Sequence, residues 1–63
     1  MSIKVGDHVE MLDDTDENVP KFTKGIIRRI FRDDAHTTLN VEFRIPGVRI
    51  INRKLPLSDI RIV

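Results

Sequence analysis

A chain of 63 residues is long enough for one domain, and a domain of this size buries only about 60% of the surface that its unfolded form exposes. The absence of cysteine excludes disulfides and thiolate metal sites, which favours a reducing, cytoplasmic location. No apolar run approaches the ~20 residues of a membrane helix, and Met1-Ser2-Ile3-Lys4 lacks the apolar stretch of a signal peptide. We therefore expect a single domain over residues 1–63 with no membrane insertion.

The net charge of +1 hides an uneven distribution along the chain. Residues 1–20 carry one lysine against six carboxylates, a sum of −5, whereas residues 21–63 carry ten lysines and arginines against four carboxylates, a sum of +6. Such asymmetry indicates an electrostatic partner. The alternative is that the two halves neutralise each other within the folded domain, where surface charge pairs contribute little.

The first predicted elements are a strand and an acidic loop. After a Gly-Asp turn signal, residues 5–11 alternate, so Val9 and Met11 face the core while His8 and Glu10 face water. Residues 13–20 show no periodicity, are rich in acidic and polar side chains and end in a proline, which predicts a long, exposed loop.

The stretch Phe22-Thr23-Lys24-Gly25-Ile26-Ile27-Arg28-Arg29-Ile30 predicts a bent strand on which the other apolar segments pack. Gly25 permits a sharp bend or a close approach of another chain segment. Ile27 and Ile30 are three residues apart, so a strand that buries both needs a bulge between them. The same spacing suits a helix, but the β-branched residues and the position of Gly25 favour a strand.

Residues 37–45 show the clearest strand pattern, with Leu39, Val41, Phe43 and Ile45 on one face. Pro46-Gly47 suits the two central positions of a type II turn and predicts a hairpin. Its return strand, residues 48–52, is expected to turn Val48 and Ile50 inward, with Arg49 outward and Ile51 on the exposed side or at the end of the barrel.

The last segment combines a single helical turn with a closing strand. Pro56 lacks an amide hydrogen, so residues 55–59 are expected to leave the sheet and form one helical turn. Residues 60–63 alternate as a short strand that pairs with the first one. Together these elements predict an all-β fold, a small five-stranded SH3-like barrel with a long acidic loop after the first strand and a single helical turn before the last.

The chain also resembles known families of small barrels. Gly25-x-Ile27-x-x-Ile30 with Val41-x-Phe43, preceded by Val5-Gly6-Asp7-x-Val9, resembles the core of KOW and Tudor-type barrels. The layout from Phe22-x-x-Gly25 through Leu55-x-Leu57-Ser58-Asp59-Ile60 is similar to the photosystem I E-type barrels. These motifs build a barrel and imply a fold more than a function.

The sequence contains no complete motif for a catalytic or metal site. Asp14-Thr15-Asp16-Glu17-Asn18 imitates the first half of a calcium loop, but Gly25 stands where the bidentate glutamate belongs. His8 and His36 have no companion ligands, and Ser58 has no triad-like setting. We expect no catalytic residue, no metal site and no cofactor, and therefore no enzyme.

The basic residues carry the remaining functional signal, because several cations on neighbouring strands would share one surface. The first hypothesis is an accessory or docking module that binds a protein partner through this basic surface and the acidic loop. The alternative is a KOW-like nucleic-acid-associated module of transcription or translation, which would use the same cations together with Lys21 and Lys54 on phosphates, although the phenylalanines are better candidates for the core. The state is expected to be a monomer or a weak homo-oligomer. The predicted partner-binding residues are Lys24, Arg28, Arg29, Arg32, Arg44, Arg49 and Arg53, and the acidic loop comprises Asp13, Asp14, Asp16 and Glu17.

Overall fold

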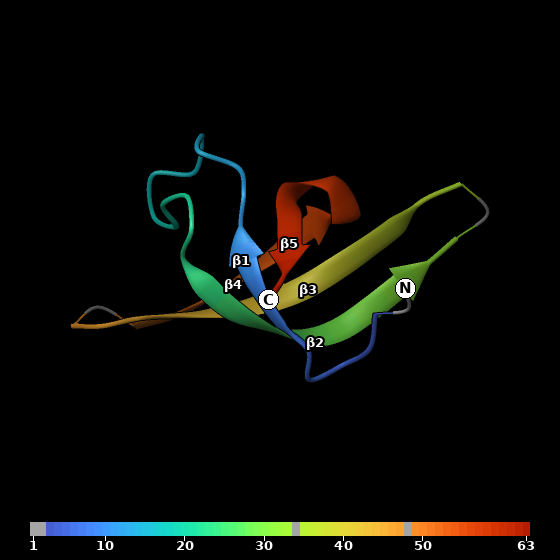
Figure 1. Cartoon of the computed structure of the whole chain (residues 1–63), viewed down its shortest axis with the longest axis horizontal. Coiled ribbons are helices and arrows are strands. Elements are labelled where there is room, and N and C mark those ends of the chain that lie inside the picture. The colour runs from blue at the N-terminus through green and yellow to red at the C-terminus, as the bar shows by residue number, and fades with distance from the viewer. Residues whose placement is uncertain (1–2, 34, 48) are drawn as a thin grey trace.

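The computed structural model describes residues 3–33, 35–47 and 49–63, which fold into five antiparallel strands of one sheet and a single 3₁₀ turn (Figure 1). This confirms the predicted all-β fold and the short turn before the last strand. The elements are β1 (His8–Met11), β2 (Lys24–Arg32), β3 (Thr37–Ile45), β4 (Arg49–Pro56), η1 (Leu57–Asp59) and β5 (Ile60–Ile62).

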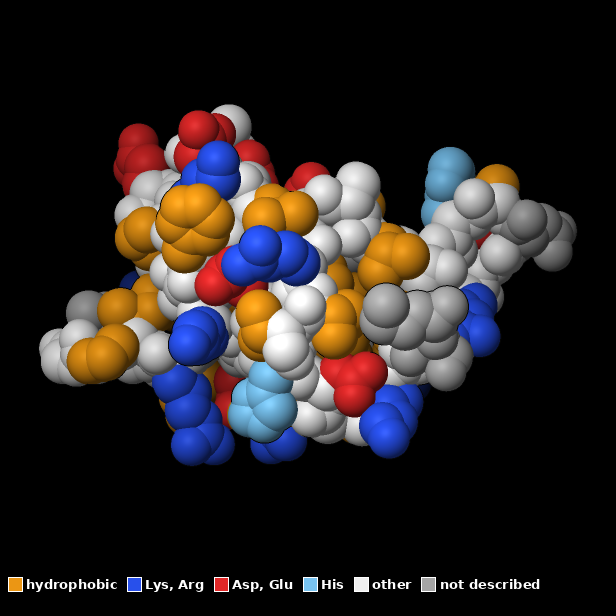
Figure 2. Space-filling view, in the orientation of Figure 1, with side chains coloured by type: hydrophobic (Ala, Val, Ile, Leu, Met, Phe, Trp, Pro, Cys, Tyr) orange, Lys and Arg blue, Asp and Glu red, His pale blue; other side chains and the backbone are white. Residues whose placement is uncertain are grey.

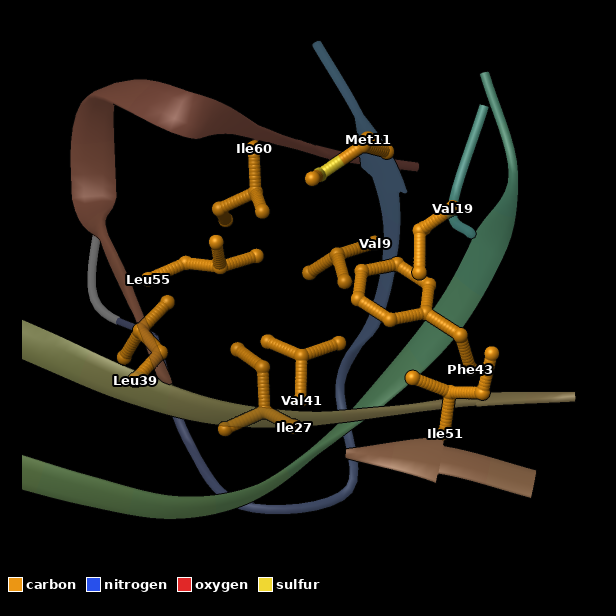
Figure 3. Close-up of a cluster of buried hydrophobic side chains, with 10 residues drawn as sticks. All are labelled: Val9, Met11, Val19, Ile27, Leu39, Val41, Phe43, Ile51, Leu55 and Ile60. Atoms are coloured by element: carbon orange, nitrogen blue, oxygen red, sulfur yellow. The ribbon is translucent and has the colours of Figure 1, made fainter. Parts of the chain in front are cut away.

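The sheet has the strand order β4-β3-β2-β1-β5. As predicted, the last strand pairs with the first, with Val9 opposite Ile62 and Met11 opposite Ile60. The sheet curls so that the core lies between β2 and β3 on one side and β1, η1 and β5 on the other (Figures 1 and 3). Within the described residues β4 and β5 do not pair, so the closure of a barrel is not confirmed.

The curl depends on β2, which combines a glycine with a bulge. A Cβ built on Gly25 would lie 2.8 Å from the Glu42 carbonyl oxygen, from Cδ1 of Phe43 and from Cγ1 of Val41, so this position accepts no side chain. The pairing with β3 shifts between Ile27 and Arg29, which is the predicted bulge. The shift turns both Ile27 and Ile30 toward the core.

The core consists of ten buried apolar side chains, shown in Figure 3. Leu39, Val41 and Phe43 alternate along β3 and are fully buried, as the sequence pattern predicts. The other members are Val9, Met11, Val19, Ile27, Ile51, Leu55 and Ile60.

The predicted facing of β4 was wrong. Ile51 is 8% exposed and Ile50 is 53% exposed, whereas the sequence pattern favoured the reverse. In the structure Ile45 pairs with Arg49 and Phe43 with Ile51, so three residues connect the strands instead of two. A shift of one residue in register moves every side chain of a strand to the opposite face. Val48 lies outside the described residues.

The prediction that residues 55–59 leave the sheet was also wrong for the first two of these residues. β4 continues to Pro56, with Leu55 opposite Leu39 and Pro56 opposite Thr38. A proline is tolerated there because β4 is an edge strand and Pro56 is its last residue. The helical turn is confined to Leu57–Asp59.

Two predictions about side chains near the first loop were wrong as well. Glu10 points away from the core as expected, but it is buried and contacts Arg61 instead of facing water. Phe22, which was assigned to the core, is 57% exposed. It has a φ of 72° in the turn closed by the bond from the Thr23 amide to the Pro20 carbonyl, a position where type II turns favour glycine.

Replacing Gly25 with alanine should destabilise the fold by about 1–3 kcal/mol, because the new methyl group meets a backbone oxygen and two core side chains. The midpoint of urea unfolding measures the loss. Lys24→Ala, one residue away on the exposed face, should stay within about 0.5 kcal/mol of the parent. Equal stability of Gly25→Ala and the parent would contradict the close packing of β2 on β3.

Replacing Phe22 with glycine should stabilise the fold by about 1 kcal/mol, because a side chain with positive φ is strained and the exposed ring loses little burial. Lys21→Gly in the same turn is the matched control. Lys21 is not among the described residues with positive φ, so its replacement should lower stability through the greater freedom of the unfolded chain. A decrease in stability with Phe22→Gly would show that the ring makes contacts which outweigh the strain.

Candidate functional site

The candidate site is the outer face of the sheet, defined here by the side chains of the five strands that point away from the core. Cross-strand partners share a face, so the register assigns its members. Its charged residues are Glu10, Lys24, Arg28, Arg29, Glu42, Arg44, Lys54 and Arg61. Its principal other residues are His8, Ile26, Phe31, Thr38, Asn40, Ile50 and Asn52.

The outer face carries six cations against two carboxylates. The other carboxylates that the structure describes lie outside this face, and four of them are in the loop between β1 and β2. Figure 2 shows acidic side chains gathered at the upper end of the molecule, whereas lysines and arginines line its lower margin, below β2. Folding therefore keeps the charge asymmetry of the sequence and turns it into two oppositely charged surfaces.

Both carboxylates of the outer face contact arginines. Glu42 lies between Arg28, at 3.6 Å, and Arg44, at 3.2 Å, while Glu10 contacts Arg61. The arginine side chains are more than half exposed, whereas the glutamates are largely covered. Glu42 therefore stays paired, while the exposed guanidinium groups of Arg28 and Arg44 can also bind a carboxylate or phosphate from solvent.

A shallow hollow of about 220 Å³ lies on the outer face where β1, β2 and β3 meet. Its apolar part is formed by Gly25 and the half-buried Ile26, and its walls by His8, Lys24, Glu42 and Arg44. Ile50 of β4 is exposed and lies opposite Arg44. Apolar contacts surrounded by cations are therefore available at this end of the outer face.

The opposite end of the outer face contains an aromatic ring between two cations. Nζ of Lys54 lies 4.7 Å from the ring centroid of Phe31, and Cζ of Arg29 lies 5.1 Å from it. The ring is half-buried on the outer face, across from Thr38. Cation–π contacts of this kind hold the two cations near each other on the surface.

The structure brings four of the seven predicted binding residues together and separates three. Lys24, Arg28, Arg29 and Arg44 share the outer face. Arg32 and Arg49 lie on the core-facing side at the ends of the two long hairpins, beyond the core itself. Arg53 also faces the core side, where it binds the loop between β1 and β2.

Sequence reasoning missed Arg61, Ile26 and Ile50 as members of the outer face. Arg61 stands between Ile60 and Ile62, so the predicted alternation of the last strand already turned it away from the core, and the structure places it opposite Glu10. Ile50 was missed because the length of the β3–β4 connection was misjudged.

The acidic loop is held against the core instead of extending freely into solvent. Val19 is fully buried, and Nε of Arg53 donates to Oδ2 of Asp16 at 2.7 Å. Asp16 also accepts a hydrogen bond from the Asn18 amide, and Asp13 accepts one from the Thr15 amide. Asp14 and Glu17 remain exposed. The predicted acidic surface is thus divided between carboxylates that fix the loop and carboxylates that face water.

The hydrogen bond from Arg53 lowers the pKa of Asp16 below its ordinary value of 3.8, and the bond from the Asn18 amide lowers it further. Both interactions favour the ionised carboxylate. The ion pair is therefore intact at neutral pH and connects the loop to β4.

In residues 3–33, 35–47 and 49–63 no three histidine or carboxylate side chains lie close enough to hold a metal ion together. No helix in the same part of the chain is long and apolar enough to cross a membrane.

Comparison with known proteins adds no relative. The chain matches no protein-family model, and no match is found among curated proteins or solved structures. The resemblance to KOW, Tudor and photosystem I E-type barrels therefore stays a prediction.

Replacing Asp16 with asparagine should change how stability depends on acid pH. Because the native pKa of Asp16 is lower than the unfolded value, its ion pair stabilises the fold above the ordinary pKa, and this contribution is lost as pH falls through the native pKa. Asp16→Asn should therefore be less stable than the parent at neutral pH and lose less stability below about pH 4. Urea midpoints across this range measure both effects.

Glu17→Gln is the matched control, since Glu17 is exposed in the same loop. Its pH profile should follow that of the parent. If the difference in stability between the parent and Asp16→Asn is the same at every pH, the Asp16–Arg53 pair does not link protonation to folding.

Proposed function

We propose that this protein is a non-catalytic docking module that binds the acidic surface of a partner protein through the outer face of its sheet. The observation that carries the proposal is that six cations share the outer face, with Lys24 and Arg44 bordering the hollow that contains Ile26. A reducing, cytoplasmic setting and a monomeric or weakly oligomeric state are parts of this proposal.

The chemistry of the outer face fits carboxylates set among apolar side chains. Lys24 and Arg44 border the hollow that contains Ile26, so a partner side chain placed there meets apolar contact and positive charge together. Interface contacts of this type gain specificity from electrostatic complementarity and affinity from the buried apolar centre. Arg28 and Arg44 are more than half exposed while they contact Glu42, so they can bind a partner carboxylate without leaving Glu42 uncompensated.

In this proposal the acidic loop helps to orient the partner as it approaches. Its exposed carboxylates, Asp14 and Glu17, repel an acidic partner, while the outer face attracts it. The Asp16–Arg53 contact holds the loop in place, so the separation of the two charges is built into the fold. A partner that approaches is thereby steered to one side of the molecule.

The double variant Lys24→Glu with Arg44→Glu tests the proposal by reversing charge at the hollow. The immobilised parent should retain partner proteins from its native cell extract after nuclease treatment, and the double variant should lose them by tenfold or more, roughly as expected when charged contacts become repulsive. Lys21→Glu with Arg32→Glu is the matched control, because it changes the same charge away from the outer face. Equal retention by the parent and the outer-face variant would contradict the proposal.

A second candidate function is the binding of single-stranded nucleic acid, and the specific observation that favours it is the Phe31 ring between Arg29 and Lys54. Exposed aromatic rings stack on bases, and neighbouring cations bind phosphates. If nuclease treatment abolishes retention and an oligonucleotide binds with log affinity falling by about 0.7 per phosphate contact with log salt, this function replaces protein docking. Phe31→Leu should then weaken oligonucleotide binding and leave the salt slope almost unchanged.

A further inference from the structure

The longer open edge of the sheet belongs to β4. The sheet ends in β5, with three residues, and in β4, with eight. Alternate residues of β4 direct their amide and carbonyl groups away from β3. Among the described residues, no backbone–backbone hydrogen bond other than those to β3 involves this strand, and the Asn52 carbonyl accepts one from the Arg53 side chain. An open edge of this length is a template for pairing with another extended chain.

Two adjoining hollows lie along the first half of this edge. One, of about 270 Å³, is lined by residues 49–53 and by Asn18 of the loop between β1 and β2. The other, of about 520 Å³, lies at the end of the β3–β4 hairpin and is lined by residues 44–47 together with Arg49 and Ile50. Both hollows border Arg49 and Ile50 of β4.

Charge decides which extended chain fits this edge. β4 carries Arg49, Arg53 and Lys54 and no carboxylate. Antiparallel pairing of two copies about Ile51 places Arg49 opposite Arg53, and a shift of one residue places Arg49 opposite Lys54. Like charges directly opposite each other destabilise a pair of strands, so a second copy in either of these registers is a poor occupant.

The charges that protect this edge from other copies attract an acidic chain. Arg53 is already bound to Asp16, which shows that this strand accepts a carboxylate from another segment. Ile50 is 53% exposed on the outer face, where an added strand gains apolar contact. Side chains of an extended chain alternate between the two faces of a sheet, so acidic and apolar residues at alternate positions suit β4.

We propose that the edge of β4 binds an extended, acid-rich segment of a partner protein as an additional antiparallel strand. Backbone hydrogen bonds to β4 provide the affinity, and Arg49, on the core-facing side of the strand, selects for carboxylates there. The edge borders the outer face at Arg44 and Ile50, but its hydrogen bonds come from the β4 backbone and not from Lys24 or Ile26, so this inference stands whether or not the hollow at Ile26 binds a partner.

The experiment uses the whole chain and a labelled, end-capped peptide of the same length as β4 with alternating glutamate and valine. Fluorescence anisotropy should detect binding, and amide hydrogen exchange should slow at alternate residues of β4. The same peptide with N-methyl groups on alternate amides keeps its charge but loses one set of backbone hydrogen bonds, and it should not bind. A lysine–valine peptide should not bind either.

Arg49→Glu should weaken the binding of the glutamate–valine peptide by about fivefold, because it replaces an attractive charge pair with a repulsive one. Arg32→Glu is the matched control, since Arg32 is an exposed arginine at the end of the other long hairpin. It should leave the affinity unchanged, and circular dichroism checks that both variants are folded.

Three results would overturn the proposal. They are equal binding of the N-methylated peptide, no binding of any peptide, and amide changes at Lys24 and Ile26 with β4 unaffected. The last result would still support binding at the outer face, so the two proposals fail separately. Slow exchange of β4 without peptide, together with a mass that rises with concentration, would assign the edge to a second copy instead.

Discussion

The packing of the β2 backbone directly on Val41 and Phe43 is the contact on which the rest of the structure depends. Gly25 leaves no room for a side chain, so β2 approaches β3 closely there while it also pairs with β1. The bulge after Ile27 then turns the strand and keeps both Ile27 and Ile30 toward the core. This curvature brings β1 and β5 over β3 and buries Phe43 completely. The chain has no disulfide and only a small core, so the stability of the fold depends on this packing.

The same bulge determines the surface. Residues of a regular strand alternate strictly between its faces, and the irregular step after Ile27 allows Arg28 to reach Glu42 while Arg29 lies beside Phe31, all on the outer face. The carboxylates are kept apart from these cations by a different contact, since the buried Val19 and the Asp16–Arg53 pair hold the acidic loop near the end of the core. A small domain with almost no net charge thereby obtains one strongly basic face.

Much of this fold could be predicted from the sequence because apolar residues at every second position mark the buried face of a strand. The alternation of Leu39, Val41 and Phe43, and the three-residue step from Ile27 to Ile30, predicted β3 and the bulge of β2. The facing of β4 was not predictable in this way, because Ile50 and Ile51 are both apolar and only the length of the hairpin connection decides between them. Pro46-Gly47 suggested two residues in that connection, whereas the structure has three.

Part of the candidate site escaped prediction for a related reason. Whether an arginine is available to a partner depends on which face it occupies and which carboxylate it meets, and both follow from pairing between distant segments. Arg53 and Arg44 look equivalent in the sequence, yet Arg53 binds Asp16, 37 positions away, while Arg44 meets Glu42 on the open face. Arg53 is 35% exposed and anchors a distant loop, whereas Arg44 is 68% exposed and can contact another molecule while it stays paired with Glu42. The division of the arginines between these two roles is what makes one side of this sheet, and not the whole basic half of the chain, the candidate surface for binding.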